Sequence, residues 1–399
     1  MGDGRDRRRP WLRSDAAREQ ESARSRQRQG DEVVQLERQR ERQGEVEQRR
    51  WVPQPRSELA EDGGARLRPR IPERQLASPQ PLRDGELERV EEPLRVAPEE
   101  LDVGIEHGRA ERCHHGALQQ AGHQVTFVAR GAHAETMRRS GLRIRSELGD
   151  AELRVKVVDD PAQAGPADLV VVAVKLWDTE ETARAVARVP GAAAVSLQNG
   201  VDKDEILAAA IGRERVLGGV THIGAVIAEP GTVAHTGRLQ RVTLGELDGS
   251  RTPRLQAAVE AFRSAGVESV LSEDIRRVTW EKFVFLSAFS GMTALTRKPI
   301  GEVRAHPATR EMLLDALREG ASVARAEGAR LDEGLARKQL EAIDALPPGM
   351  LASMAQDLLR GRRLELPWLS GAVVRRAEKH QLPVPTHRAI YAGLVLHAG

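Results

Sequence analysis

The sequence has one cysteine and no long apolar run. These two absences exclude several classes of protein. Cys113 alone excludes an intramolecular disulfide and a multi-cysteine metal site. The adjacent His114 and His115 lack the spacing of metal ligands, so we expect no metal. No apolar stretch approaches the roughly 20 residues that span a bilayer. The opening MGDGRDRRRP carries no apolar segment behind its charges, unlike a secretory signal. We therefore expect a cytoplasmic protein that does not enter a membrane.

Residues 1–115 lack five residue types altogether: lysine, asparagine, threonine, phenylalanine and tyrosine. They carry roughly two dozen arginines among many Glu and Gln, as in ERQRERQGEVEQRR. Burial of so few apolar side chains cannot offset a backbone entropy cost of about 1–2 kcal/mol per residue. The acidic residues nearly balance the arginines and aromatic residues are scarce, so we expect no nucleic-acid partner. We predict that residues 1–115 are a disordered or mistranslated extension.

Strands and helices alternate in residues 116–250. The runs DLVVVAV (168–174) and AAAVSLQNG (192–200) are typical of strands buried on both faces of a parallel sheet. Residues 179–188 between them predict a crossover helix. This alternation indicates an α/β fold with a doubly wound, Rossmann-like sheet, whose ligands bind at the carboxyl ends of the strands.

Two further segments of this region predict antiparallel pairs. GLRIRS (141–146) and AELRVKVV (151–158) alternate in polarity around a Leu-Gly-Asp turn and predict a hairpin. Residues 218–245 alternate and turn in the way of antiparallel strands at a sheet edge.

Three polar residues follow the predicted strands: Arg130, Lys175 and Asn199. Arg130 stands where an acidic residue would bind the ribose hydroxyls of NAD, and a guanidinium there suits the extra phosphate of NADP. Each residue alone is equally well interpreted as a solvated surface group. Their occurrence at three successive strand ends favours a cofactor site.

Residues 251–399 follow a helical pattern. In the stretch VTWEKFVFLSAFSGMTALT, five apolar residues share one broad helical face: Trp280, Phe283, Val284, Ala288 and Met292. Similar periodicity recurs in MLLDALREGASVARAEG and PWLSGAVVRRAEKH. We predict an all-α helical domain that carries substrate-binding and catalytic residues.

From about residue 121 to its end, the chain resembles the ketopantoate reductase family (2-dehydropantoate 2-reductases). The order and spacing of several motifs carry the resemblance: AGHQVTFVARG, VVVAVKLWDTEE, SLQNGVD, GGVTHIGA, VTWEKFVF, SMAQDLLRGRRLEL and LPVPTHRAIYAGL. The resemblance implies a Rossmann domain joined to an all-helical domain. It also implies NADPH-dependent reduction of 2-dehydropantoate to pantoate, a step of pantothenate and coenzyme A biosynthesis. The expected partners are a small 2-oxo acid and, in a homodimer, a second copy of the chain.

The resemblance assigns roles to individual residues of the predicted cofactor site. Arg130 and Lys175 match residues that hold the 2′-phosphate of NADPH in the family. Asn199 matches a residue that lies near the nicotinamide.

On the helical side, Lys282 matches the catalytic lysine of the family. Reduction of a 2-oxo acid puts negative charge on oxygen, which a desolvated ammonium can stabilise and protonate. Glu365 matches a glutamate that bonds the substrate hydroxyl and positions the lysine. Ser353 and Ser290 are the expected substrate-binding residues.

The residues alone leave other interpretations of these positions open. Lys282 can also be interpreted as a lysine on an apolar helix whose ammonium extends to the solvent. Glu365 is also a surface partner for Arg362 or Arg363, and Ser353 is also a helix cap.

One part of the family pattern is missing. Its first strand and G-x-G-x-x-G loop should occupy about residues 101–113, where no G-x-G occurs. LDVGI predicts a poor strand, and HGRAERCHHG is too polar to begin a packed helix. We hypothesise a frame error upstream, with a real extension and a degenerate loop as the alternative.

Two further functions stay open. Some members of the family have asparagine at the positions of Leu286 and Ser290. Because Leu286 cannot donate a hydrogen bond, the substrate of this protein could be a different 2-oxo acid. Loss of the glycine loop suits an inactive NADP-binding protein.

Overall fold

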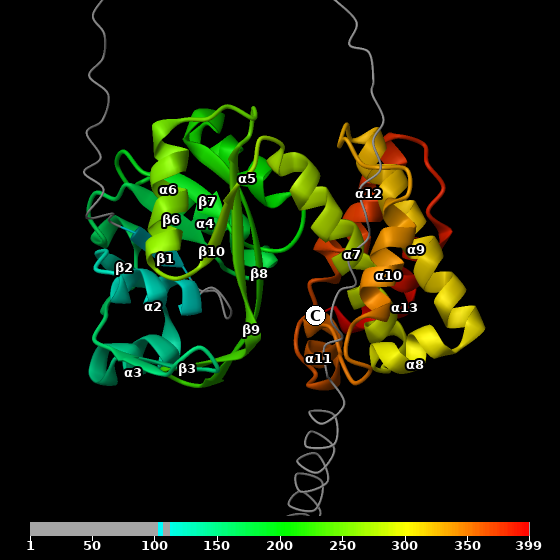
Figure 1. Ribbon diagram of the computed structural model, residues 1–399, viewed down its shortest axis with the longest axis horizontal. Coiled ribbons are helices and arrows are strands. Elements are labelled where there is room, and N and C mark those ends of the chain that lie inside the picture. Colours follow the sequence, from blue (N-terminus) through cyan, green and yellow to red (C-terminus); the bar gives the residue numbers. More distant parts are fainter. Residues whose placement is uncertain (1–102, 107–111, 399) are drawn as a thin grey trace, which may run out of the picture. The chain divides into compact units, whose positions relative to one another are not determined.

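A computed structural model describes residues 103–106 and 112–398, which lie within one compact unit of the chain. These residues form a ten-stranded sheet followed by a group of helices (Figure 1). The strands are β1 (Val103–Glu106), β2 (Val125–Val128), β3 (Leu142–Ser146), β4 (Ala151–Leu153), β5 (Lys156–Val158), β6 (Leu169–Val172), β7 (Ala193–Ser196), β8 (Val216–Glu229), β9 (Thr232–Glu246) and β10 (Glu268–Leu271). The α-helices are α2 (Arg112–Gln120), α3 (Gly131–Ser140), α4 (Thr179–Val186), α5 (Lys203–Ile211), α6 (Pro253–Ser264), α7 (Ile275–Thr296), α8 (Ile300–Ala305), α9 (Pro307–Ala326), α10 (Leu335–Asp344), α11 (Ser353–Leu359), α12 (Ser370–Lys379) and α13 (Pro385–Leu394).

The strand order is β4-β3-β9-β8-β7-β6-β1-β2-β5, with β10 paired to β9. Strands β7, β6, β1 and β2 run parallel to one another. Parallel neighbours are joined by crossovers, and helices cover both faces of this sheet. Leu118 of α2 and Phe262 of α6 belong to one core, whereas Val186 of α4 and Leu207 of α5 belong to another. The predicted Rossmann-like, doubly wound fold is confirmed.

Both predicted antiparallel pairs are present. Strands β3 and β4 form the expected hairpin, with Leu142 opposite Leu153. Strands β8 and β9 are antiparallel as expected, but they do not lie at the sheet edge, because β3 and β10 also pair with β9. Alternation of polarity identified the strands and could not reveal these distant partners.

The prediction that the first strand is missing was wrong. Strand β1 lies between β2 and β6 and is parallel to both, with Gly104 paired to Thr126 and Val170. Hydrogen bonds to two strands stabilise a short segment whose own β propensity is weak. The glycine-loop prediction falls largely on residues 107–111, outside the described residues, and stays a prediction.

Helix α2 also contradicts the expectation that this segment is too polar to pack. Cys113, His114 and His115 are all buried. The two imidazole rings make edge contacts, His114 with Phe262 and His115 with Phe127. Aromatic edges and hydrogen bonds therefore allow a polar sequence to pack as a helix.

The boundaries of the two structural parts differ from the predicted ones. Strand β1 and helix α2 begin before residue 116 and belong to the sheet part. Helix α6 and strand β10 lie beyond residue 251, yet β10 extends the sheet beside β9. The group of helices therefore begins with α7 at Ile275. The interpretation of residues 1–102 as an extension lies outside the described residues.

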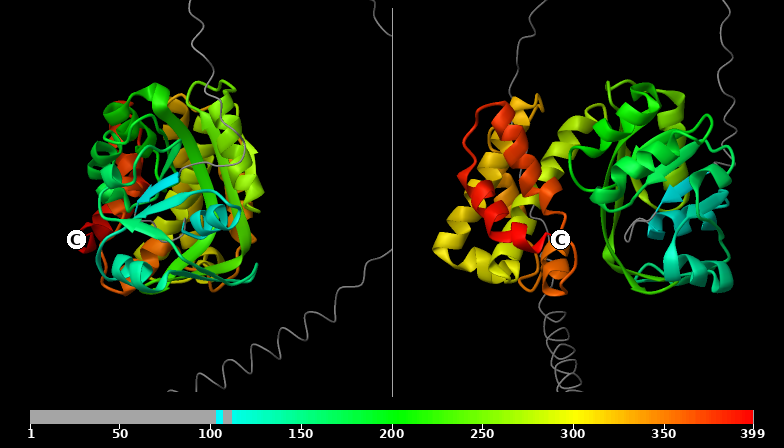
Figure 2. Two further views of the ribbon diagram at one scale, coloured as in Figure 1. Left: turned by 90° about the vertical axis from the view of Figure 1, so that its left-hand side faces the viewer. Right: turned by 180° about the vertical axis from the view of Figure 1, so that it is seen from behind.

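Helix α7 is the centre of the helical part. Asp274 caps its first turn by accepting a hydrogen bond from the backbone N–H of Arg277 at 3.0 Å. The predicted apolar face is buried in one core with α9, α11, α12 and α13. Figure 2 shows these helices, in yellow to red, together around α7. Among the helices described, none combines the length and the apolar character of a membrane span.

A group of charges around the buried Arg376 connects the sheet part to the helices. Arg376 of α12 donates hydrogen bonds to Asp202 at 2.6 Å and to Glu205 at 2.9 Å, both near the start of α5. Arg376 also pairs with Glu327, which bonds His380 at 2.9 Å. Asp202 lies three residues after Asn199, so the group holds the turn beyond β7 against α12.

The buried His387 makes stability depend on pH. Its Nε2 lies 3.0 Å from the carbonyl oxygen of Ala316, and burial lowers its pKa to about 4. Because this folded pKa lies below that of an unfolded histidine, the unfolded state takes up the proton first as the pH falls. Stability present above about pH 6.5 is therefore lost toward pH 4.

We expect His387 to lower the free energy of unfolding by about 2 kcal/mol between pH 7 and pH 5. His387→Gln keeps a donor and cannot titrate, so the variant should lose correspondingly less. Urea unfolding of both proteins at the two pH values measures the difference. Equal losses in the two proteins would contradict the titration of His387.

Candidate functional site

The three predicted cofactor residues follow neighbouring parallel strands. Arg130 comes directly before α3 and two residues after β2, Lys175 follows β6, and Asn199 follows β7. Their strands lie in the order β7-β6-β1-β2. The sheet topology therefore brings the three residues to one edge, where α/β proteins bind ligands.

Arg130 is an exposed residue with an exposed partner. Its Nη1 lies 3.2 Å from Oε1 of Glu181, in the first turn of α4. Burial raises the pKa of Asp178, as does Glu181, whereas Arg363 and Arg130 oppose the rise. Exposed ion pairs contribute little, about 0–1 kcal/mol, so a stronger anion can displace the Glu181 carboxylate.

Lys175 forms two ion pairs with carboxylates of the C-terminal segment. Its Nζ lies 3.2 Å from Oδ2 of Asp357 and 3.2 Å from Oε2 of Glu365, and both carboxylates are buried. The other oxygen of Glu365 accepts a hydrogen bond from the backbone N–H of Leu176 at 3.2 Å. The structure thus joins two predicted site residues, one expected to bind cofactor and one expected to bind substrate.

An aromatic group beside Lys175 was not singled out from the sequence. The indole rings of Trp177 and Trp368 lie 6.3 Å apart, centre to centre. The guanidinium of Arg363 lies 4.7 Å from the centre of the Trp177 ring, and Lys175 Nζ lies 5.5 Å from it. Trp177 stands in a motif of the family resemblance and Trp368 lies two residues after another, but their approach depends on the fold. Flat rings and cations at a strand end suit a flat anionic ligand.

Two glycines fix the start of α7 against the sheet. A Cβ added to Gly218 of β8 would lie 2.7 Å from Cγ2 of Ile275, and one added to Gly245 of β9 would lie 2.8 Å from its Cβ. Only glycine permits this approach without a shift. Lys282 lies two turns further along the same helix.

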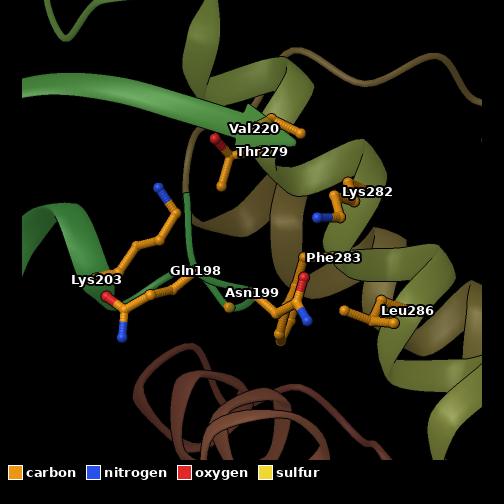
Figure 3. Close-up of a pocket in the computed structure, with 9 residues that line it drawn as sticks. Gln198, Asn199, Lys203, Val220, Thr279, Lys282, Phe283 and Leu286 are labelled. Carbon is orange, nitrogen blue, oxygen red and sulfur yellow. The ribbon is translucent and has the colours of Figure 1, made fainter. Parts of the chain in front are cut away.

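Lys282, on α7, lines a small pocket that is partly open to solvent. Figure 3 shows it between strand β8, which carries Val220, and the turn that carries Asn199. Its Nζ donates a hydrogen bond to the carbonyl oxygen of Thr221 at 2.6 Å. The pocket lining is Gln198, Asn199, Gly200, Lys203, Val220, Thr279, Lys282, Phe283 and Leu286. The structure therefore brings together Lys282 and Asn199, two residues predicted from separate motifs.

Lys203 is a second lysine of the pocket, which the sequence analysis missed. Its side chain is buried, and Nζ donates to the carbonyl oxygens of Ser196 and Gly219 at 2.9 and 3.0 Å. The third acceptor is Oδ1 of Asp204 at 2.7 Å. Burial raises the pKa of Asp204, and the Lys203 ammonium opposes the rise. With three acceptors, Lys203 ties β7 to β8 beneath the pocket.

The neighbouring polar side chains hold the turn after β7. Gln198 donates from Nε2 to the Val174 carbonyl oxygen and to Oγ1 of Thr179, each at 2.9 Å. Its Oε1 accepts from the Ser196 hydroxyl at 2.8 Å. Asn199 is thereby presented by a turn whose own polar groups are paired.

His222, next to Thr221, is electrically neutral at pH 7. Burial, together with smaller effects of the positive charges of Lys282 and Arg241, lowers its pKa to about 4. The imidazole therefore adds no positive charge beside the Lys282 ammonium.

Ser290 and Ser353 occupy different surroundings from Lys282. Ser290 is fully buried in α7, and its Oγ has no hydrogen-bond partner among the described residues. Ser353 is exposed and begins α11, whose N-cap residue is Ala352, so it is the first helical residue rather than the cap. Neither serine lines the pocket, and the substrate-binding roles of both remain predictions.

Comparison with known proteins agrees with this architecture. The family pattern described as "Ketopantoate reductase PanE/ApbA" matches residues 113–249, and "Ketopantoate reductase PanE/ApbA C terminal" matches residues 274–397. A 2-dehydropantoate 2-reductase of Archaeoglobus fulgidus is 35% identical over 276 residues, 69% of this chain and 90% of the relative.

Solved structures of this fold cover most of the chain. A PanE/ApbA family ketopantoate reductase from Ralstonia eutropha JMP134 has a TM-score of 0.69 at 30% identity, covering 75% of this chain and 98% of its own. A D-mandelate dehydrogenase solved with NADH and anilino(oxo)acetate has a TM-score of 0.68, covering 75% and 98%; at 19% identity it shows the fold alone. With a family pattern on both structural parts and relatives of this identity and coverage, the chain belongs to the ketopantoate reductase family of oxidoreductases.

Proposed function

We propose that the protein reduces 2-dehydropantoate to pantoate with NADPH, in the pathway to pantothenate and coenzyme A in the cytoplasm. One observation carries the proposal: the Lys282 ammonium and Asn199 share a pocket at the carboxyl edge of the sheet. The family membership of the chain and the named activity of its relatives support the choice of substrate.

The residues at the sheet edge fit an NADP cofactor. Arg130 would bind its 2′-phosphate by exchanging Glu181 for a doubly charged partner. Lys175 would contribute a second cation, with the Trp177 ring beside it. Asn199 would face the nicotinamide end.

The chemistry of the reaction needs a group that neutralises an emerging alkoxide. The bound cofactor supplies the hydride. Lys282 would then stabilise the negative charge on the C2 oxygen of the 2-oxo acid and transfer a proton from Nζ to that oxygen. The Thr221 carbonyl holds Nζ at 2.6 Å and keeps the amine pointed into the pocket.

Glu365 and Ser353 would position the substrate. Glu365 has a buried carboxylate at the same sheet edge, where it pairs with Lys175. In the proposed reaction Glu365 bonds the substrate hydroxyl, and Ser353 bonds a polar group of the substrate from the start of α11. Exchange of Lys175 between Glu365 and a cofactor phosphate would release the carboxylate for this role.

A different 2-oxo acid is the second candidate substrate. Val220, Phe283 and Leu286 give the Lys282 pocket three apolar walls. Such walls favour an apolar substituent over the hydroxymethyl group of 2-dehydropantoate. A panel of 2-oxo acids with apolar and hydroxylated side chains distinguishes the two candidates by kcat/KM.

Removal of the amine should slow the chemical step. Lys282→Ala should lower kcat for NADPH oxidation at least tenfold, since a positioned general acid contributes roughly 100- to 10,000-fold. Lys298→Ala is the matched control, because Lys298 forms an exposed pair with Glu302 on α8. Absorbance at the NADPH band measures turnover. An unchanged kcat in Lys282→Ala excludes this lysine from the mechanism, and no turnover of any 2-oxo acid by wild type excludes the reductase.

Loss of the exposed guanidinium should affect the phosphorylated cofactor selectively. We expect Arg130→Ala to raise KM for NADPH about tenfold, the equivalent of one charge-assisted hydrogen bond, and to leave KM for NADH nearly unchanged. Arg188→Ala, which removes another exposed arginine paired with an aspartate, is the control. Equal increases for the two cofactors would contradict phosphate recognition by Arg130.

A further inference from the structure

A chain of hydrogen bonds leads from α2 to Lys282 through residues that the proposed function does not use. His114 of α2 is fully buried, and its Nε2 lies 2.9 Å from Oγ1 of Thr221. Its Nδ1 lies 3.3 Å from the side-chain nitrogen of Gln240 on β9. Thr221 is the residue whose carbonyl oxygen accepts the hydrogen bond from Lys282.

The donors and acceptors of these hydrogen bonds fix the direction in which each bond is donated. The amide nitrogen of Gln240 can only donate, so His114 Nδ1 accepts, and the proton of a neutral imidazole lies on Nε2. Nε2–H therefore donates to Thr221 Oγ1. The Thr221 hydroxyl in turn donates to the carbonyl oxygen of Arg241 at 3.3 Å. Every polar atom in the series has a compatible partner.

The surroundings of His114 keep the ring neutral and fixed. Burial, together with a smaller electrostatic effect of His235, lowers the pKa of His114 to about 3. The ring meets Phe262 edge to face, with centres 6.1 Å apart and planes at 87°. The imidazole thus serves as a rigid donor at physiological pH rather than as a proton carrier.

Thr221 is held from two sides. Its hydroxyl lies between His114 and the Arg241 carbonyl, and its side chain is buried. A β-branched side chain has little freedom about χ1, so fixing the hydroxyl also restrains the backbone of residue 221. A restrained Thr221 carbonyl in turn restrains the Lys282 amine that donates to it.

We propose that His114 is a positioning residue for Lys282, acting through the hydroxyl and the carbonyl of Thr221. This inference rests on the proposed catalytic role of Lys282. It links the helix of the first βα crossover to the amine on α7. No sequence motif marks His114 for this role, and its partner Gln240 lies 126 residues away in the sequence.

The test compares substitutions that remove and keep each hydrogen bond in the full-length protein. We expect Thr221→Val and His114→Leu to lower kcat about tenfold, with little change in KM for NADPH, as for loss of one hydrogen bond that orients the amine. Thr221→Ser and His114→Gln retain a hydroxyl and a donor, so they should recover most of the rate. Thr236→Val is the matched control, since Thr236 donates an equivalent bond to Gly224 at 3.1 Å elsewhere on the β8–β9 pair.

A double-mutant comparison separates positioning from a general effect on folding. In a Lys282→Ala background, Thr221→Val should cause no further loss of kcat, because the effect acts through the missing amine. A kcat for Thr221→Val equal to that of Thr221→Ser, or the full loss in the Lys282→Ala background, overturns the inference. The Thr221 variants decide the matter even if His114→Leu fails to fold.

A readout without turnover keeps this inference distinct from the proposed function. Competitive labelling with acetic anhydride, read by mass spectrometry, reports the reactivity of the Lys282 amine relative to Lys298. We expect Thr221→Val to raise the relative labelling of Lys282 and Thr221→Ser to leave it near wild type. If wild type reduces no 2-oxo acid, the proposed function fails, and this ratio still decides the positioning role: identical ratios in the two variants refute it.

Discussion

The close approach of Ile275 to Gly218 and Gly245 is the constraint on which the rest of the site depends. It fixes the first turn of α7 against two adjacent strands. Lys282, two turns later, and Thr221, three residues after Gly218, are then set by the same contact. A side chain at either glycine would separate the helix from the sheet and move donor and acceptor apart. The hydrogen bond between Lys282 and Thr221 is thus a consequence of backbone packing.

Three lysines lie near the sheet edge: Lys203, Lys175 and Lys282. They differ in their burial and in their hydrogen-bond partners, and so in what they can do. Lys203 donates hydrogen bonds to Ser196, Gly219 and Asp204 and thereby holds β7 and β8 together. Lys175 bridges to carboxylates from a distant segment. Lys282 donates to the main-chain carbonyl of Thr221, and in the proposed reaction its ammonium faces the substrate oxygen.

The parts of the fold that follow from local pattern could be predicted from the sequence. Runs of β-branched residues gave the buried strands, and the positions of Arg130, Lys175 and Asn199 followed because parallel strands end at one edge. The apolar face of α7 followed from its helical period.

The parts that depend on distant partners could not be predicted. Strand β1 is a weak sequence held by β2 and β6 on either side, and α2 buries histidines whose partners lie far along the chain. The pairing of Lys175 with Glu365 joins residues 190 positions apart. The acceptors of Lys203 on β7 and β8 come together only when the two strands pair in the folded protein.

The ion pairs of Lys175 have a thermodynamic consequence for ligand exchange. The Lys175 ammonium cannot bind Asp357, Glu365 and a phosphate with equally good geometry. The more strongly it binds the two carboxylates, the lower is its affinity for the phosphate. Linkage makes this relation reciprocal: an anion that captures Lys175 loosens Glu365 by the same amount. In the proposed function, the cofactor and substrate halves of the site would therefore be coupled by competition for the Lys175 ammonium.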